Sequence, residues 1–136
     1  MRAFPLKIVT PDGVKFDGSA EELVVRTTTG DMGIQAGHIS CVAPLGMGQA
    51  MILADGRKRY AACIGGMVSV TKEEVRIVAT TFEWADEIDV KRAEASAARA
   101  QNVIADKSAA DTDIRLAEAR LKRALVRKSV AGYKSK

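Results

Sequence analysis

Glycine and proline are confined almost entirely to the first 84 residues of this 136-residue chain. That part holds ten of the eleven glycines and all three prolines, whereas residues 85–136 hold thirteen alanines and one glycine. Glycine and proline separate short strands and turns, while alanine interspersed with Glu, Lys and Arg favours helix. The sequence therefore predicts two domains, residues 1–84 and residues 85–136, with different secondary structure.

The first part is predicted to form an all-β sandwich of about ten short antiparallel strands. Short runs of β-branched and apolar residues recur at 6–10, 14–16, 22–29, 39–43, 49–53, 60–64, 67–71 and 75–80. No helical pattern separates these runs, which favours antiparallel pairing. Turn sequences lie between them, because they supply a preset or positive φ; they include Pro11-Asp12-Gly13, Gly30-Asp31, Asp55-Gly56 and Gly65-Gly66.

The second part is predicted to form an antiparallel hairpin of two helices, joined by the short segment 105–111. Apolar residues recur with helical spacing on each helix. The first stripe is Ala93, Ala97, Ala100 and Ile104, and the second is Ile114, Ala117, Leu121 and Leu125. Asp86 or Asp89 is expected to cap the first helix, and Asp111 or Thr112 the second. Each buried alanine removes little surface from water, so the hairpin is expected to be held weakly.

Composition narrows the class of protein. Aromatic residues make up only 4% of the chain, which argues against a nucleic-acid binder built on base stacking. Two cysteines, Cys41 and Cys63, are too few for a disulfide scaffold. The uncharged stretch 32–54 is interrupted by glycine and proline, so we expect a soluble protein rather than a membrane span. The first thirteen residues lack the apolar core of a signal peptide.

Basic residues concentrate at the end of the chain. From Arg115 onward there are eight basic residues and one acidic residue, Glu118, for a net charge of +7. Such a helix suggests an anionic partner, which could be nucleic acid, acidic lipid headgroups or an acidic protein surface. A recognised nucleic-acid motif is absent, and the apolar stripe is modest for a membrane surface. A solvated face that keeps the protein in solution is the simplest alternative.

A catalytic or metal site receives little support from the sequence. His38, the single histidine, could be combined with Asp31, Cys41 and Cys63, but their spacing matches no standard ligand pattern. A Cys–His nucleophile pair lacks a third residue to orient it, and buried cysteines are most simply small apolar side chains. The glycines also form no phosphate-binding loop of the Walker type. An enzyme is therefore the weakest hypothesis.

Charged residues on the two helices form a candidate anion site. Asp89 and Arg92 lie three residues apart on one helix face, with Arg99 two turns further along; Arg123 and Arg127 lie four apart on the second helix. Guanidinium groups suit phosphate oxygens, and a carboxylate suits the donors of ribose or adenine. Alternatively, Asp89 caps the helix and the arginines form solvated pairs within each helix.

Several motifs, taken in order, resemble the epsilon subunits of bacterial F-type ATP synthases. These motifs are Thr10-Pro11-Asp12-Gly13, Gly30-Asp31-Met32-Gly33-Ile34 followed by Gly37-His38, Gly65-Gly66, Ile88-Asp89-Val90-Lys91-Arg92-Ala93 and Leu121-Lys122-Arg123-Ala124-Leu125. The resemblance covers almost the entire chain. The fold of that family, a β-sandwich followed by two antiparallel helices, agrees with the fold predicted above from pattern.

The resemblance implies a non-catalytic rotor subunit of the central stalk, which couples proton flow to ATP synthesis. The implied partners are the gamma subunit, the c-ring and, when the hairpin extends, acidic segments of the beta subunits of the catalytic hexamer. The extended hairpin would inhibit ATP hydrolysis. The implied location is peripheral, on the cytoplasmic side of a bacterial cell membrane. No cofactor is required, and regulatory ATP is a candidate ligand.

The resemblance also implies site residues. The Gly30–His38 loop would contact the c-ring and stalk through Asp31 and His38; the alternative is a surface turn with a solvated histidine.

Regulatory ATP would be bound by Glu83, Ile88, Asp89, Arg92, Ala93, Arg99, Arg123 and Arg127. The competing hypothesis is a stand-alone basic module whose hairpin binds nucleic acid, with an affinity that falls steeply as salt rises.

Overall fold

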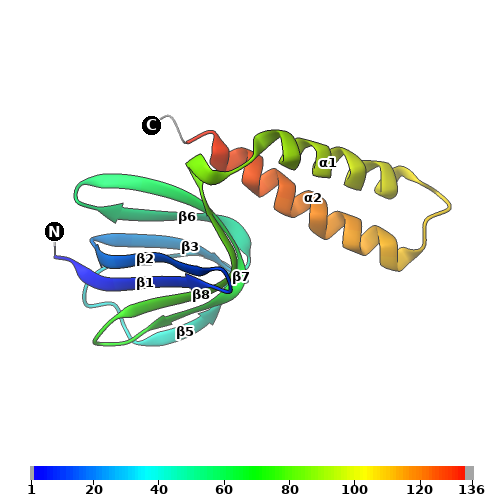
Figure 1. Ribbon diagram of the computed structural model, residues 1–136. Helices are drawn as coiled ribbons and strands as arrows, with labels where there is room; N and C mark the ends of the chain where they lie inside the picture. The colour runs from blue at the N-terminus through cyan, green and yellow to red at the C-terminus, as the bar shows by residue number, and fades with distance from the viewer. Residues whose placement is uncertain (1, 134–136) are drawn as a thin grey trace. The chain divides into compact units, whose positions relative to one another are not determined.

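Strands and helices are segregated along the chain in the computed structural model, which describes residues 2–133 (Figure 1). Within that range every strand precedes Ala85 and both α-helices follow it. The backbone contacts divide the chain into two units, one ending at Trp84 and the other beginning at Ala85. A β-rich first unit followed by a helical hairpin confirms the predicted fold class.

The first unit contains eight strands in its described residues, fewer than the ten or so predicted. They are β1 (Phe4–Thr10), β2 (Gly13–Ala20), β3 (Glu22–Thr27), β4 (Gly30–Ile34), β5 (Cys41–Pro44), β6 (Met47–Ala54), β7 (Arg57–Val70) and β8 (Val75–Trp84). Their order in the sheet is β2-β1-β8-β7-β6-β3-β4, and β5 also pairs with β7. The pairs are antiparallel except β1 with β8, which run parallel. These two strands are joined through the rest of the unit, so no hairpin turn fixes their relative direction.

Gly65 and Gly66 do not separate two strands, as predicted, but lie inside β7. The strand keeps one register with β8 from Ala61 to Val70. On its other side, β6 pairs with residues up to Ile64 and β5 with residues from Met67 onward. Both glycines have positive φ, which lets the strand turn from one layer to the other without ending. This continuity accounts for one of the missing strands.

The segment 30–38, expected to be a loop, begins with a strand. Residues Gly30–Ile34 form β4 and pair with β3, with Arg26 opposite Asp31 and Thr27 opposite Gly30. Gly30 has φ +130 at the tight turn between the two strands, which glycine adopts readily. The loop itself is therefore confined to the residues between Ile34 and Cys41.

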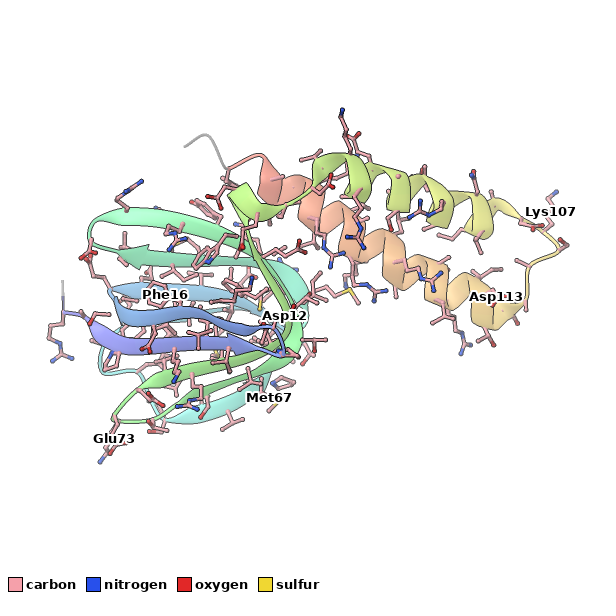
Figure 2. All side chains as sticks on the ribbon, viewed as in Figure 1. Asp12, Phe16, Met67, Glu73, Lys107 and Asp113 are labelled. Carbon is pink, nitrogen blue, oxygen red and sulfur yellow. The ribbon has the colours of Figure 1, made fainter. Side chains whose placement is uncertain are left out.

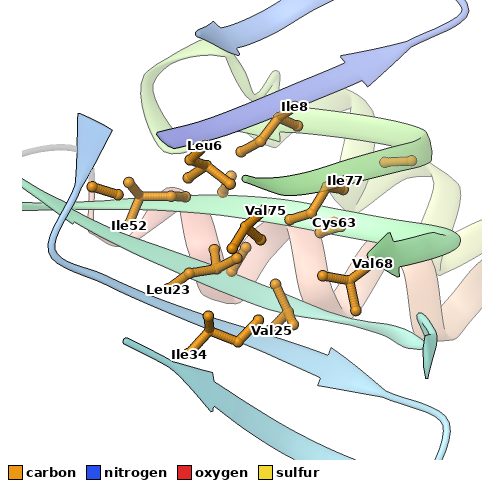
Figure 3. Packing of buried hydrophobic residues seen from close by; sticks show 14 of the residues in the cluster. Leu6, Ile8, Leu23, Val25, Ile34, Ile52, Cys63, Val68, Val75 and Ile77 are labelled. Atoms are coloured by element: carbon orange, nitrogen blue, oxygen red, sulfur yellow. The ribbon is translucent and has the colours of Figure 1, made fainter. Parts of the chain in front are cut away.

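The core lies between the inward faces of these strands (Figure 3). Alternate residues point inward because side chains in a strand alternate between its faces. Among the most deeply buried are Leu6 and Ile8 of β1, Leu23 and Val25 of β3, and Ile77 of β8. The aromatic end of this core has Phe82 and Trp84 edge to face, with ring centroids 5.0 Å apart.

The second unit contains a 3₁₀ turn (Ala85–Glu87) and the helices α1 (Val90–Ala105) and α2 (Asp111–Ala131). Ala93, Ala97 and Ala100 of α1 are buried, as predicted, and Ala117 of α2 is buried with them. The prediction for Leu125 was wrong, because that side chain is 48% exposed. Its neighbour Ala124 is buried instead, since it lies two turns beyond Ala117 on the same face.

Helix starts follow the prediction in α1 but not in α2. Asp89 occupies the N-cap of α1, which settles the choice between Asp86 and Asp89. In α2 the N-cap position is Ala110, with no side-chain cap, so the expectation of Asp111 or Thr112 was wrong. Asp111 and Asp113 lie instead in the first turn, where their charges favour the positive end of the helix dipole. Neither helix of the described range is long and apolar enough to cross a bilayer.

Candidate functional site

Asp89, the carboxylate predicted to meet a nucleotide, is committed to the backbone of α1. Its Oδ1 accepts a hydrogen bond from the backbone N–H of Arg92 at 3.1 Å. Its backbone is extended, with φ −83 and ψ 97, and its carbonyl accepts from the N–H of Ala93 at 3.0 Å. These are the features of a helix N-cap. The side chain of Asp89 therefore caps α1, which was the alternative to nucleotide binding.

The predicted arginines fall into two groups by exposure. Arg92 and Arg99 are exposed on α1, whereas Arg123 and Arg127 are partly buried on α2. Since the short linker makes the helices antiparallel, the start of α1 and the end of α2 lie at the same end of the hairpin (Figure 1). Arg92 and Arg127 therefore belong to one end of it. Arg99 lies about 10 Å further along α1, at 1.5 Å per residue.

The other three residues of the predicted nucleotide site differ in environment. Ile88 and Ala93 are each 5% exposed, so a ligand could reach them only through backbone atoms or after the hairpin rearranges. Glu83 belongs to the first unit, on β8 opposite Ala62 of β7. The structure thus gathers seven of the eight predicted residues into one unit and leaves Glu83 in the other.

Asp31 lies at a tightly bonded corner, which we call the β3–β4 corner (Arg26–Asp31). Its Oδ1 accepts a hydrogen bond from Nε of Arg26 at 2.6 Å. This bond and the charge of Asp31 raise the pKa of Arg26. The hydroxyl of Thr27 donates to the carbonyl of Gly30 at 2.7 Å and accepts from the N–H of Thr29 at 3.2 Å, which fixes the turn. The charged pair itself remains open to solvent.

His38 lies beyond the opposite end of β4 from Asp31. Its Nδ1 is 2.8 Å from the carbonyl oxygen of Ile39, and its side chain is exposed. It lines an open pocket of about 830 Å³ together with Arg2, Phe4 and Lys72. Because a strand advances about 3.3 Å per residue, Ile34 lies about 10 Å along β4 from Asp31, and His38 follows beyond Ile34. The structure does not bring Asp31 and His38 together.

The residues weighed as a metal or nucleophile site are dispersed. Cys63 lies in the middle of β7, where burial raises the pKa of its thiol to about 12. Cys41 is half-buried on β5, opposite Val70, the last residue of β7. Across residues 2–133, no three His, Cys, Asp or Glu side chains gather closely enough to hold a metal ion.

An apolar row on the outer face of the sandwich was missed by the sequence analysis. Val14, Val9, Val78, Met67 and Pro44 are successive cross-strand neighbours on β2, β1, β8, β7 and β5. Three of them are substantially exposed: Val14 at 58%, Val78 at 50% and Met67 at 43%. Figure 2 labels Met67, the member of this row on β7. A parallel row is polar, with Asp17, Lys7, Arg76 and Ser69 in register.

A signal for this apolar row does exist in the sequence. In β8, Val78 follows directly after the core residue Ile77, so apolar side chains occur on both faces of the strand. An exposed apolar row across several strands is typical of a protein-binding surface rather than of free surface. The apolar row as a whole depends on the strand register, which places residues 14 and 44 in line with residue 67.

Two family descriptions match consecutive parts of the chain. Residues 3–85 match the β-sandwich domain of the ATP synthase delta/epsilon chain, and residues 86–132 match its long α-helix domain. Among similar proteins, the ATP synthase epsilon chain of Bacillus velezensis is 43% identical over 132 residues, which cover 97% of this chain and 99% of the relative. The epsilon chain of Ruminococcus albus is 42% identical over 135 residues, 98% of this chain and 100% of the relative.

Solved structures show the same fold at lower identity. A chain in the cryo-EM structure of the Euglena gracilis mitochondrial ATP synthase, which includes F1 and the c-ring, matches with a TM-score of 0.83 at 21% identity. The match covers 93% of this chain and 80% of that chain. A chain from the central stalk and c-ring of the Tetrahymena thermophila mitochondrial ATP synthase has a TM-score of 0.61 at 15% identity, covering 96% and 97%.

Proposed function

The chain belongs to the ATP synthase delta/epsilon chain family, and on that premise we propose that it couples proton flow to ATP synthesis and regulates ATP hydrolysis. As an epsilon chain it is a non-catalytic subunit of the central stalk of an F-type ATP synthase, associated with the membrane through that complex. The single observation that carries the proposal is the match of both units, in order, to relatives that the chain covers nearly end to end.

The proposed partner of the apolar row is the gamma subunit of the central stalk. The row runs across five strands of the outer face, and Val14, Val78 and Met67 are exposed in the isolated chain. Burying them against a neighbour would contribute about 25 cal/mol for each Å² removed from water. The polar row beside it, with Lys7 and Arg76, would form the rim of such an interface.

Asp31 and His38 are proposed as two separate contacts. Asp31 lies at the start of β4 and His38 beyond its other end, so one small loop of a partner cannot engage both. We assign Asp31 to the c-ring, in line with the resemblance noted above. His38, on the rim of the pocket beside Arg2 and Lys72, is assigned to the neighbouring stalk.

Regulation is proposed to reside in the hairpin. Its seam is lined largely by alanine, with Ala93, Ala97 and Ala100 facing Ala117 and Ala124 across the pair. Such a seam buries little apolar area, so the helices can separate at modest cost. The exposed basic side chains of α2, including Arg120 and Lys122, would then meet acidic segments of the beta subunits and slow hydrolysis. Lys134 and Lys136 of the basic run lie outside the described residues.

ATP is proposed as the ligand that holds the hairpin closed. Arg92 and Arg127 belong to one end of the hairpin, where guanidinium groups could bind phosphate oxygens. A ligand that binds only the closed form stabilises it by about 2.7 kcal/mol at 100 times its Kd. A shift of that size is sufficient to bias a weakly packed pair. The cytoplasmic side of a bacterial cell membrane is the proposed location, because cytoplasmic ATP would then be sensed directly.

A charge placed in the apolar row tests the proposed function. Val78→Asp should prevent the chain from restoring ATP-driven proton pumping to complexes that lack their own epsilon chain. Gln49→Asp is the matched control, because Gln49 is exposed on β6 and lies outside the apolar row. If Val78→Asp binds and restores pumping as well as Gln49→Asp does, the row is not the stalk interface. If the wild-type chain fails to restore pumping, the proposed function itself is wrong.

A further inference from the structure

Arg26 and Asp31 face each other directly across the hairpin of β3 and β4. The bond from Nε of Arg26 to Oδ1 of Asp31 is 2.6 Å, short even for a charge-assisted hydrogen bond. Isolated ion pairs on a surface contribute little to stability, and both side chains are at least half exposed. Stability alone therefore does not account for this pair near the tip of the hairpin.

The path of the Arg26 side chain is set by a glycine on the neighbouring strand. A Cβ at Gly48 of β6 would lie 2.5 Å from Cβ of Arg26 and 2.8 Å from its Cγ. Gly48 is buried and its φ is not positive, so its backbone does not demand glycine. The requirement comes from Arg26, which lies directly against this position. At Gly46 an added Cβ would lie 3.2 Å from the carbonyl oxygen of Thr27 and 3.7 Å from Cγ of Arg26.

We propose that Arg26 is a positioning residue for Asp31, and that Gly48 is kept free of a side chain because the base of the Arg26 side chain packs against it. Since β6 and β4 flank β3 on opposite sides, this packing leaves the guanidinium free to reach Asp31 on β4. The inference rests on the proposed function, in which Asp31 contacts the c-ring. It adds that the carboxylate is presented in one fixed orientation, with its charge balanced by the guanidinium. A carboxylate held in this way loses less side-chain entropy when a partner docks.

Two-dimensional NMR of the full chain tests the positioning directly, without any partner. The Nε–Hε signal of Arg26 should be shifted downfield and protected from solvent exchange in the wild-type chain. Asp31→Ala should remove that shift, because the acceptor is gone, and Gly48→Ala should remove it by displacing Arg26. Gly18→Ala is the matched control, because an added Cβ there meets only the Phe16 ring at an ordinary 3.8 Å. An Arg26 signal unchanged by Asp31→Ala would overturn the inference.

Binding of the assembled F1 to membranes stripped of F1 then separates the inference from the proposed function. Asp31→Ala should weaken binding about five-fold, because it removes the contact. Arg26→Gln should weaken binding by a smaller factor, and the double variant should match Asp31→Ala, because Arg26 acts only through Asp31. If Asp31→Ala weakens binding and Arg26→Gln does not, positioning is wrong while the Asp31 contact stands. If Asp31→Ala has no effect, the c-ring contact is wrong, and the Arg26 NMR signal alone decides the positioning. Arg26→Gln is used here instead of Gly48→Ala, because an added Cβ at Gly48 would clash with Arg26 and could unfold the sheet locally.

Discussion

The carboxylate of Asp89 caps the helix on which Arg92 sits, through the 3.1 Å hydrogen bond from the backbone N–H of Arg92 to Oδ1 of Asp89. Two of the residues predicted to bind a nucleotide, Asp89 and Arg92, are thus coupled through the backbone before any ligand binds. Loss of Asp89 would loosen the first turn of α1 and move Arg92 with it. Experiments on this site must therefore separate capping from ligand binding.

Two variants, Asp89→Ala and Asp89→Asn, distinguish helix capping from ligand binding. Asparagine caps a helix about as well as aspartate, whereas alanine costs about 1 kcal/mol. Asp89→Ala should lower the stability of the hairpin in thermal unfolding followed by circular dichroism, and Asp89→Asn should leave it nearly unchanged. If the carboxylate itself contacts ATP, Asp89→Asn should still weaken ATP binding. Equal ATP affinity in Asp89→Asn and wild type would reduce Asp89 to a structural cap.

Arg92→Ala should weaken ATP binding while leaving the sandwich folded. Arg92 is exposed at the start of α1, so its loss removes a phosphate donor and no core contact. Calorimetric titration with ATP is the measurement. Arg115→Ala is the matched control, because Arg115 is also exposed but lies at the other end of the hairpin. Identical affinities for the two variants would contradict the proposed phosphate role.

Gly66→Ala should destabilise the sandwich severely. Gly66 has φ +111, and a Cβ there would lie 2.0 Å from the carbonyl oxygen of Val78 on β8. A backbone contact cannot move aside as a side chain can, so the expected loss is at least about 3 kcal/mol of unfolding free energy. Denaturant unfolding followed by Trp84 fluorescence measures it. Gly33→Ala, where an added Cβ meets nothing within 4 Å, should behave like wild type.

The two thiols should differ in reactivity. Burial raises the pKa of Cys63 from 9.0 to about 12, whereas Cys41 is only half-buried. Since the thiolate is the reactive form, a colorimetric thiol reagent at pH 8 should modify Cys41 well before Cys63. Both should react after unfolding in denaturant. Rapid modification of Cys63 in the native Cys41→Ser variant would show that the β7 core opens more readily than the structure indicates.

The same pKa shift makes stability depend on pH at the alkaline end. The folded state keeps the Cys63 proton up to about pH 12, while the unfolded chain releases it near pH 9.0. Unfolding then becomes more favourable as pH rises through that window, and this group has no effect below it. Cys63→Ala should remove that part of the alkaline loss of stability in denaturant unfolding. An unchanged pH profile would place the cause elsewhere.

Local turn chemistry explains which parts of the fold were predictable. Asp55 and Gly56 both have positive φ and join β6 to β7, as their sequence indicated. Gly65-Gly66 carries the same signal but lies within a strand, because a change of layer also needs positive φ. One glycine pair therefore ends a strand and the other bends one. Only the pairing of β7 with both β5 and β6 distinguishes them.

Residues of the candidate sites were predictable to different degrees. The capping role of Asp89 follows from local sequence, because an aspartate just before a helical pattern is a common N-cap. The β3–β4 corner at Asp31 could not be predicted from local sequence. Gly30, Asp31 and Gly33 form a pattern typical of a turn, although they belong to the strand β4. The packing of Arg26 against Gly48 is a contact between residues 22 positions apart. Likewise, the apolar row arises from the register of five strands, which no local pattern contains.

The central claim, a non-catalytic subunit whose basic hairpin restrains hydrolysis, is tested most directly by the ATPase rate of the catalytic hexamer with gamma. The account predicts that adding the full chain lowers this rate. It also predicts that the Arg120→Glu/Lys122→Glu double variant binds equally well, as judged by co-purification, but inhibits much less, because both side chains are exposed on α2. A rate unaffected by the wild-type chain, or inhibited equally by the double variant, would contradict it.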